Sequence, residues 1–235
     1  MNSGMIKEYK QAAADAAATQ LQNGMIVGLG SGTTATLAVA AIGQRVKQGL
    51  KITGIATSEK TADQARLLGI PLSTLDEHGA IDITIDGADQ VEERTLNLIK
   101  GGGGNLLREK IVAVASSRMI VVVDESKITP QLGNHFSLPV EVVPFGWKTT
   151  AKRLKKMGAH PALRIGSDGK TFLTDGGHYI LDCAFGPIES ARQLQAELDS
   201  TVGVVEHGLF LGIAYQVLVG GSRGVSTLTR EQSNS

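Results

Sequence analysis

The sequence predicts an α/β fold: a doubly wound, mostly parallel sheet with helices on both faces, plus a smaller α+β, ferredoxin-like domain. In the first half of the chain, short apolar runs alternate with alanine-rich segments, an order typical of parallel strands joined by right-handed crossovers. The 29 glycines among 235 residues cluster where these runs end, which indicates local demands on the backbone. Beyond Gly133, closely spaced hairpin-turn residues predict the second domain.

The first domain begins with an alanine-rich helix over residues 6–21, which Asn23 and Gly24 bring to an end. Ser58 is suited to cap a later helix that stops at Gly69. In chain order, the predicted strands cover residues 25–29, 52–56, 81–85 and 119–123, and the further helices cover residues 35–46, 58–68 and 105–115.

The second domain combines four predicted strands with two helices. The strands cover residues 140–143, 162–165, 179–183 and 203–206, and the helices cover residues 148–157 and 187–198, the latter opened by Pro187. This order resembles a split βαβ unit. We therefore expect residues 133–204 to form a small domain inserted into a larger one made of residues 1–132 and 205–235. The apolar stretch 208–219 suits one or two buried strands, and the last dozen residues suggest disorder.

Composition removes several classes of function. With 23 basic and 23 acidic residues, the chain lacks the charge excess and the basic runs that binding to nucleic acid or to an anionic membrane requires. The single cysteine, Cys183, rules out an intrachain disulfide, and the five histidines lack zinc-ligand spacing, so we expect no metal. The N-terminus has no signal-peptide core, and no apolar stretch reaches the ~20 residues of a membrane span. The cytoplasm is therefore the expected compartment.

A glycine loop is the first candidate site. Residues 28–34 (GLGSGTT) join a predicted strand to a helix, an arrangement that directs backbone amides at an anion. The hydroxyls of Ser31, Thr33 and Thr34 would add donors. The loop matches neither the dinucleotide pattern nor the P-loop, so a small phosphate ester is the better ligand. The alternative is a tight turn that binds nothing.

Two carboxylates form the second candidate. Asp86 and Asp89 follow a predicted parallel strand at its carboxyl end, where doubly wound folds bind their ligands. An Asp-rich capping turn and a magnesium site with oxygen ligands are the alternatives.

The third candidate is Lys100 with the four glycines that follow it and Glu109 on the next predicted helix. Ordering four glycines costs backbone entropy, so close approach of a ligand is a better explanation than a flexible linker. Glu109 would lie near the positive end of its helix, although a surface Glu paired with a basic residue is the plainer interpretation. Together, the three candidates describe proton transfer on a small phosphorylated molecule, with Lys100 as the electrophile.

These motifs resemble the type A ribose-5-phosphate isomerase family over about the whole chain. The matching segments, in the family's order, are GLGSGTTAT (28–36), TSEKT (57–61), DGAD (86–89), KGGGGNLLREKIVA (100–113), LPVEVVP (138–144) and HGLF (207–210). Asn105 departs from the pattern, because a small residue such as Ala is expected there.

The resemblance implies an aldose–ketose isomerase that interconverts D-ribose 5-phosphate and D-ribulose 5-phosphate through an enediolate, with no cofactor. It implies that Glu109 is the base, that Lys100 stabilises the oxyanion, that Asp86 assists ring opening and that Asp89 binds sugar hydroxyls. A homodimer or homotetramer is also implied. The substrate site would be lined by Lys10, Ser31, Gly32, Thr33, Thr34, Gly101, Gly102 and Lys127.

Two other classes stay open at this point. An amino-sugar phosphate deaminase or a coenzyme A transferase would need a catalytic His near the acidic pair or a glutamate nucleophile. A non-catalytic sugar-phosphate sensor would need a DNA-binding segment, for which the roughly 24 residues before the first strand are too few.

Overall fold

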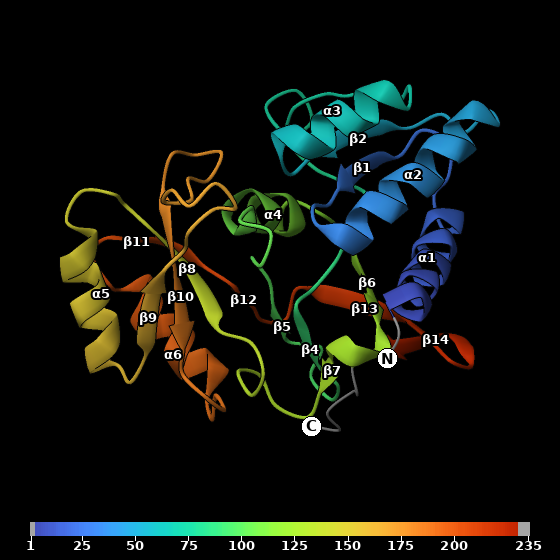
Figure 1. The fold of residues 1–235 in the computed structure, drawn as a ribbon. Helices are drawn as coiled ribbons and strands as arrows, with labels where there is room; N and C mark the ends of the chain where they lie inside the picture. The colour runs from blue at the N-terminus through green and yellow to red at the C-terminus, as the bar shows by residue number, and fades with distance from the viewer. Residues whose placement is uncertain (1–2, 230–235) are drawn as a thin grey trace.

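The computed structural model describes residues 3–229, which form a six-stranded sheet, two four-stranded sheets and six α-helices (Figure 1). The helices are α1 (Ser3–Thr19), α2 (Thr33–Lys47), α3 (Glu59–Leu67), α4 (Leu106–Val114), α5 (Trp147–Lys156) and α6 (Ala191–Asp199), with a 3-10 turn η1 (Glu125–Lys127). The strands are β1 (Ile26–Leu29), β2 (Thr53–Ala56), β3 (Ile83–Asp86), β4 (Gln90–Glu92), β5 (Leu98–Ile99), β6 (Met119–Asp124), β7 (Ile128–Thr129), β8 (Leu138–Val142), β9 (His160–Leu163), β10 (Tyr179–Ala184), β11 (Val204–His207), β12 (Leu209–Phe210), β13 (Ala214–Gly221) and β14 (Gly224–Thr229).

The large sheet has the strand order β14-β13-β6-β3-β1-β2, and every pair except the β13–β14 hairpin is parallel. This confirms the predicted mostly parallel sheet. Leu29 at the end of β1 pairs with Ile85, so the loop after β1 lies beside Asp86 at the end of β3. The glycine loop and the Asp pair, 55 residues apart in the chain, therefore meet at one edge of the sheet.

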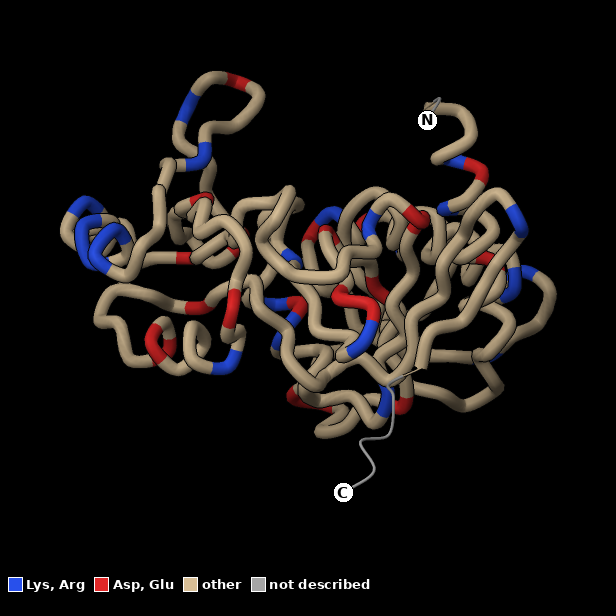
Figure 2. Tube along the Cα trace, turned by 90° about the horizontal axis from the view of Figure 1, so that it is seen from below, with Lys and Arg blue, Asp and Glu red and all other residues tan. Residues whose placement is uncertain are grey.

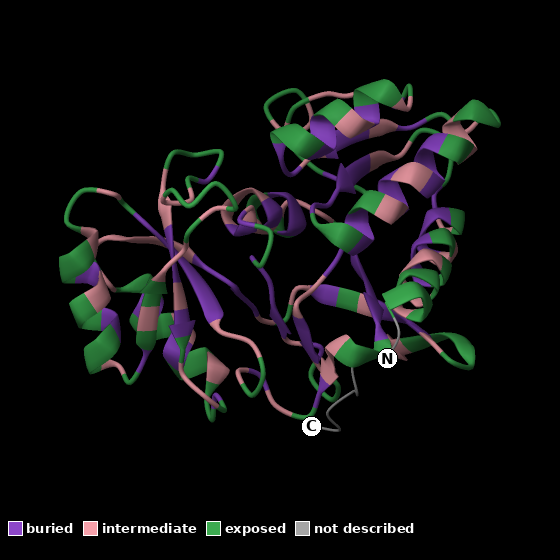
Figure 3. Cartoon of the chain, viewed as in Figure 1, coloured by how far each residue is buried: buried purple, intermediate pink, exposed green. Residues whose placement is uncertain are grey.

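Both faces of the large sheet are covered except at its edge strand β14, as Figure 3 shows by the buried colour of the inner strands and the exposed colour of β14. Strand β6 illustrates the alternation: Ile120 and Val122 pack into the core beneath α1 and α2, whereas Val121 packs into the core on the other face, with Ala113 of α4. The side of α1 that faces the sheet consists of small residues, so this helix packs closely. They are Ala13, Ala14, Ala17 and Ala18, all at most 2% exposed.

A second sheet, with the order β12-β5-β4-β7, lies on the α4 side of the large sheet. Its strands have two or three residues each. Such short strands have no readable alternation of apolar and polar residues, which is why the sequence did not predict them. They matter for function because β5 ends at Ile99, immediately before Lys100.

The third sheet, called the small sheet below, is antiparallel with the order β11-β8-β10-β9. Its strands and helices follow one another as βαββαβ, with α5 and α6 as the crossovers, which confirms the predicted ferredoxin-like unit. It has its own apolar core, to which Leu154 of α5 and Leu198 of α6 contribute. The domain limits at residues 133 and 204 stay a prediction.

Two expectations need correction. The helix expected to open at Pro187 begins at Ala191, because the hydroxyl of Ser190 accepts a hydrogen bond from the amide of Gln193 and caps it there. The last dozen residues are not all disordered: Gly224–Thr229 form β14, whose backbone pairs with β13 although most of its side chains are exposed. Residues 230–235 lie outside the described part of the chain.

Charge is unevenly distributed over the surface. Figure 2 shows basic residues gathered on α5, at the end of the molecule away from the large sheet; they are Lys148, Lys152, Arg153, Lys155 and Lys156. Within residues 3–229, no helix is both long and apolar enough to cross a membrane.

Candidate active site

A pocket opens where the carboxyl ends of the parallel strands meet the tetraglycine loop. Most of the residues predicted to form the site line it, and they come from segments far apart in sequence. Its lining consists of Ser31, Gly32, Thr33, Thr34, Gly87, Ala88, Asp89, Lys100, Gly101, Gly103, Glu109 and Lys127. Three predicted residues are not part of this wall: Lys10, Asp86 and Gly102.

At the base of the pocket, Lys100 lies between two buried carboxylates. Its Nζ is 3.0 Å from Oδ2 of Asp86 and 3.2 Å from Oε2 of Glu109, and it donates a hydrogen bond of 2.7 Å to the carbonyl of Gly87. Asp86 is at the end of β3, Lys100 follows β5, and Glu109 is in the first turn of α4. All three are at most 3% exposed. Buried charges need partners of opposite charge, and here Lys100 is the partner of both carboxylates.

The close packing of these three residues shifts their proton affinities. Burial raises the pKa of Glu109 to about 8, although Lys100 opposes the shift and Asp86 adds to it. Burial also raises the pKa of Asp86. For Lys100, burial by itself lowers the pKa, but the charges of Asp86 and Glu109 outweigh it and raise the pKa. The site thus combines a permanent cation with a carboxylate whose pKa is near neutrality, as general-base catalysis requires.

Asp86 is the structural centre of the site and is fully buried. Its Oδ1 accepts hydrogen bonds from the amides of Ser31 (3.1 Å) and Gly87 (2.7 Å). The approach to the glycine loop is so close that a Cβ atom at Gly30 would lie 2.2 Å from Oδ1, so this position requires glycine. Asp86 therefore fixes the glycine loop and reaches the pocket through Lys100.

Asp89 lies in the wall of the pocket. Its Oδ2 accepts a hydrogen bond of 2.7 Å from the amide of Gly102. This contact ties the tetraglycine loop to the segment after β3, and it accounts for the place of Gly102 just behind the wall that Gly101 and Gly103 form.

Ser31 was predicted to offer its hydroxyl to a phosphate group, but in the structure this hydroxyl bonds to other side chains. Its hydroxyl lies in a buried group of four hydroxyls, called the hydroxyl cluster below, where its Oγ is 2.6 Å from Thr57, 3.0 Å from Ser58 and 3.2 Å from Thr61. The partners all come from the TSEKT segment. From the sequence, this segment supported the family resemblance and Ser58 was predicted as a helix cap, but its role in fixing the loop was not predicted.

The two predicted lysines both lie near the start of α2. Nζ of Lys10 lies 3.2 Å from Oγ1 of Thr33 and 3.8 Å from Oδ2 of Asp124, which is fully buried. Lys127, in the turn η1 that follows Asp124, also lines the pocket. A helix N-terminus near two lysines attracts anions such as a phosphate group.

Asn105, the departure from the family pattern, is the residue before α4. Its side chain makes no capping hydrogen bond to the helix, and its Nδ2 lies 3.4 Å from the carbonyl of Gly103. Its side chain thus contacts the tetraglycine loop, and its backbone carbonyl accepts a hydrogen bond of 2.9 Å from the amide of Glu109 within the helix.

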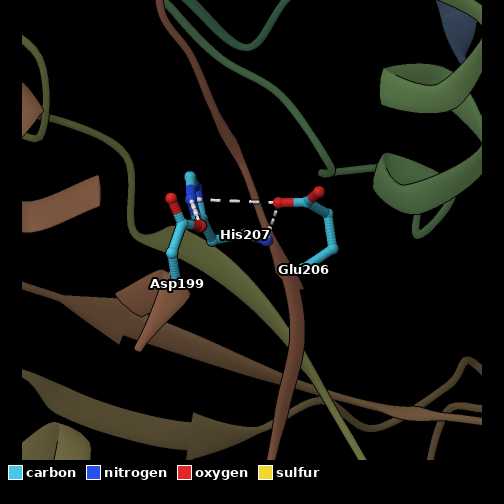
Figure 4. A group of neighbouring side chains, drawn as sticks. All are labelled: Asp199, Glu206 and His207. Atoms are coloured by element: carbon cyan, nitrogen blue, oxygen red, sulfur yellow. Dashed lines mark hydrogen bonds and ion pairs between the residues drawn. The ribbon is translucent and has the colours of Figure 1, made fainter. Parts of the chain in front are cut away.

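Within residues 3–229, one group of side chains has the composition of a metal site: Asp199, Glu206 and His207 (Figure 4). The amide of Leu209 donates to Nδ1 of His207 (3.2 Å), so the proton of the neutral ring is on Nε2, which donates to Asp199 (3.1 Å). Burial lowers the pKa of His207 to about 4, which keeps the ring neutral. Glu206 is already paired with Lys110. This group is therefore satisfied by hydrogen bonds and an ion pair, without a cation.

The fold and the pocket together define a class: an α/β enzyme that binds a small anionic substrate beside a buried lysine–carboxylate group suited to moving protons. The model of one family, ribose 5-phosphate isomerase A (phosphoriboisomerase A), matches residues 53–224. The chain belongs to this family.

Relatives support the assignment over nearly the full length. A ribose-5-phosphate isomerase A of Synechococcus sp. is 54% identical over 94% of this chain and 96% of its own, and that of Gluconobacter oxydans is 50% identical over 92% and 94%. Among solved structures, the enzyme of Methanocaldococcus jannaschii is 41% identical with a TM-score of 0.91, covering 95% of this chain and 99% of its own. A D-ribose-5-phosphate isomerase in complex with phospho-erythronic acid is 36% identical with a TM-score of 0.93, covering 98% and 100%.

These findings decide between the classes left open by the sequence. The chain is a ribose-5-phosphate isomerase, an enzyme that interconverts D-ribose 5-phosphate and D-ribulose 5-phosphate, and not a deaminase, a coenzyme A transferase or a sensor.

Proposed function

We propose that Glu109 is the base that carries the proton between C2 and C1 of the open-chain sugar phosphate. The observation that supports this role is the burial of Glu109 at the base of the pocket, 3.2 Å from the ammonium group of Lys100. Its raised pKa keeps it basic enough to remove a proton from carbon and acidic enough to return it. A single carboxylate then serves both halves of the reaction.

Lys100 stabilises the negative charge that develops on the substrate oxygen in the enediolate. It is held in place before substrate arrives, so the reaction requires no reorganisation of its charge. The tetraglycine residues of the pocket wall, Gly101 and Gly103, supply amides that assist it, whereas Gly102 contributes through its hydrogen bond to Asp89. Such a donor is typically worth about 3 kcal/mol in the transition state.

The two aspartates divide the handling of the sugar. Asp89, in the wall of the pocket, binds the sugar hydroxyls or relays their protons. Asp86 assists ring opening, and since it is fully buried, it acts on the pocket through Lys100.

The phosphate binds at the start of α2. Gly32, Thr33 and Thr34 line the pocket there, with Lys127 on one side and Lys10 in contact with Thr33. Ser31 contributes by holding the loop through the hydroxyl cluster. Binding energy from this group, which does not react, positions the carbons that do.

The decisive experiment compares Glu109→Gln with Glu189→Gln, a change at an exposed glutamate before α6. Glu109→Gln keeps the size of the side chain but removes the base, so we expect kcat to fall about 10²–10⁴-fold while phospho-erythronic acid still binds. In deuterated water, the wild type incorporates deuterium at C1 or C2 and Glu109→Gln does not. Normal turnover and labelling by Glu109→Gln would assign the base to another group.

We extend the proposal to the setting of the enzyme: a homodimer or homotetramer in the cytoplasm, with no partner beyond its substrate and its own copies, no nucleic acid and no membrane. Phe145 is 94% exposed and Val202 76%, which supports a surface that a second copy covers. Light scattering of the purified protein gives the oligomeric state directly.

A further inference from the structure

The tetraglycine loop has to be held in one conformation, because its first residue follows Lys100 and its last residue leads into the helix of Glu109. Four successive glycines lose more conformational entropy on ordering than any other sequence of that length. In the structure, a single side chain of the small sheet holds two of the four residues. Nη1 of Arg164 donates to the carbonyl of Gly101 at 2.8 Å and to that of Gly102 at 3.2 Å.

Arg164 is itself fixed on two sides. It follows β9, and its Nε donates to Oδ2 of Asp182 on β10 at 2.9 Å, while Nη2 pairs with Oδ1 of the same carboxylate. Its guanidinium carbon lies 5.9 Å from the ring centre of Phe172. That ring packs against the end of the loop, where a Cβ atom at Gly104 would lie 2.4 Å from it. Asp182, Arg164 and Phe172 together are called the loop clamp below.

The direction of these hydrogen bonds explains why the clamp matters for chemistry. In a trans peptide, the carbonyl and the following amide point in opposite directions. Holding the carbonyl of Gly101 therefore directs the amide of Gly102 away from Arg164, and this amide donates to Asp89 at 2.7 Å. Holding the carbonyl of Gly102 likewise orients the amide of Gly103, a residue of the pocket wall.

The positive charge of Arg164 has the same effect on the loop amides as its hydrogen bonds: both favour donation toward the pocket. A guanidinium group on the carbonyl side polarises both peptide units and strengthens the amides on the opposite side as donors. Arg164 does not line the pocket, so it acts on the substrate only through the loop.

We propose that Arg164 is a positioning residue for the isomerase reaction: through the loop clamp, the small sheet aligns the tetraglycine amides and Lys100 for the transition state. The proposal rests on the proposed function, since it assumes that those amides and Lys100 act on the enediolate.

The test compares Arg164→Gln with Arg153→Gln. Arg153, on α5, is a matched control because its Nη1 also donates to a backbone carbonyl, that of Val202 at 2.7 Å, but far from the loop. We expect Arg164→Gln to lower kcat about 10- to 100-fold with KM changed less than about threefold, because misalignment costs transition-state binding first. Arg153→Gln stays within about twofold of the wild type in both.

A purely structural role predicts a different result: the thermal transition of Arg164→Gln would fall, and kcat at a temperature well below it would not. Hydrogen exchange separates the two further. We expect the amides of residues 101–104 to exchange faster in Arg164→Gln, with those of α5 and α6 unchanged. Guanidinium ion at millimolar concentration is expected to restore part of kcat to Arg164→Ala, and methylammonium is not.

If Arg164→Gln does not fold, Asp182→Asn replaces it as the test, because this change leaves Arg164 in place and weakens its anchor. We then expect a smaller loss of kcat and faster hydrogen exchange in the tetraglycine loop. Unchanged kcat and loop exchange in the variant that folds would overturn the proposal. If instead Glu109→Gln or Lys100→Gln retained full activity, the proposed function would fail, whatever the result at Arg164.

Discussion

Lys100 shows how strongly one residue depends on its neighbours in this site. It brings one positive charge between two carboxylates, so the three side chains together carry one negative charge when all are ionised. Burial makes that excess costly, and the cost appears as the raised pKa of Glu109. If Glu109 is the base, as we propose, Lys100 and Asp86 also determine the pH range in which it works.

The pH dependence of kcat/KM follows from the ionisation of Glu109. The base must be ionised, so activity falls as pH falls through its pKa, and we expect the midpoint of the acidic limb well above 4.5, toward 8. Asp86→Asn removes a negative charge that raises this pKa, so the residual activity of that variant has its midpoint at lower pH. Rate profiles of both proteins test this.

The comparison with Asp86→Asn is needed because the phosphate of the substrate also titrates, near pH 6. The substrate's own ionisation is the same for both proteins, so only a midpoint that moves between them belongs to the enzyme. Equal midpoints in the two profiles would contradict the assignment to Glu109.

His207 leads to a prediction about metals. Its Nδ1 accepts from Leu209 and its Nε2 donates to Asp199, so neither nitrogen has a free lone pair for a cation. The proposed mechanism uses the charge of Lys100 where a metal would otherwise act. We expect exhaustive EDTA treatment, followed by dialysis, to leave kcat and KM unchanged; loss of activity that zinc or magnesium restores would refute this.

The charged residues of the candidate site could be predicted from the sequence, whereas the residues that hold its loops in place could not. Asp86, Lys100 and Glu109 belong to dense local motifs whose chemistry is recognisable in isolation. Arg164 belongs to no motif, and its function appears only when the chain brings it beside residues 62 and 63 positions away. Thr57 and Thr61 likewise acquire a role only through the spatial proximity of Ser31.

At the scale of elements, the start of α3 serves two purposes. Oγ of Ser58 accepts from the amide of Thr61 at 3.1 Å as an N-cap, and it is also a member of the hydroxyl cluster, 3.0 Å from Ser31. Helix capping and positioning of the phosphate loop therefore depend on one hydroxyl.

Ser58→Ala and Ser190→Ala separate these two purposes. Ser190 caps α6 in the same way, through the amide of Gln193, but has no contact with the cluster. Each variant is expected to lose about 1 kcal/mol of unfolding free energy. Only Ser58→Ala is expected to raise KM, about two- to tenfold, which corresponds to the net loss of one hydrogen bond. Urea unfolding and steady-state kinetics measure both, and equal KM values would contradict a link between the cluster and the phosphate.

Helices and strands with a regular pattern of apolar residues were predicted well from the sequence. Strands that depend on backbone pairing with a neighbouring strand were not. The helix of residues 6–21 and the strand of residues 119–123 agree with α1 and β6 within a few residues. β14 was missed because most of its side chains are exposed and its apolar residues, Val225 and Leu228, do not alternate with polar ones. Its strand structure comes from backbone pairing with β13. The start of α6 was misplaced because Pro187 suits the first turn of a helix, while the cap was supplied three residues later by Ser190.

At the scale of the whole molecule, the proposed active site lies where the three sheets meet. The large sheet supplies Asp86, the strand β5 of the second sheet leads to Lys100, and the small sheet holds the loop between them and α4 through Arg164 (Figure 1). No single sheet contains the site, so the stability of the assembled fold maintains a buried charged group that is unfavourable by itself.

The free-energy cost of burying Asp86, Lys100 and Glu109 together leads to a prediction about the stability of the folded protein. The pKa of Glu109 is raised from 4.5 to about 8 in the folded protein, so the native state binds its proton more tightly than the unfolded chain does. Stability is then greatest below pH 4.5, as far as this residue contributes, and declines as pH rises toward 8. Glu109→Gln cannot ionise and escapes this decline.

We therefore expect the difference in unfolding free energy between Glu109→Gln and the wild type to move in favour of the variant by up to about 4 kcal/mol between pH 5 and pH 9, since one pKa unit corresponds to about 1.4 kcal/mol and the raised pKa already includes the opposing charge of Lys100. Denaturant unfolding at both pH values measures it, and Glu189→Gln, at an exposed position, is expected to show no such change. A difference that is independent of pH would mean that Glu109 titrates alike in the folded and unfolded states, and then the burial of this residue could not be what adjusts it for catalysis.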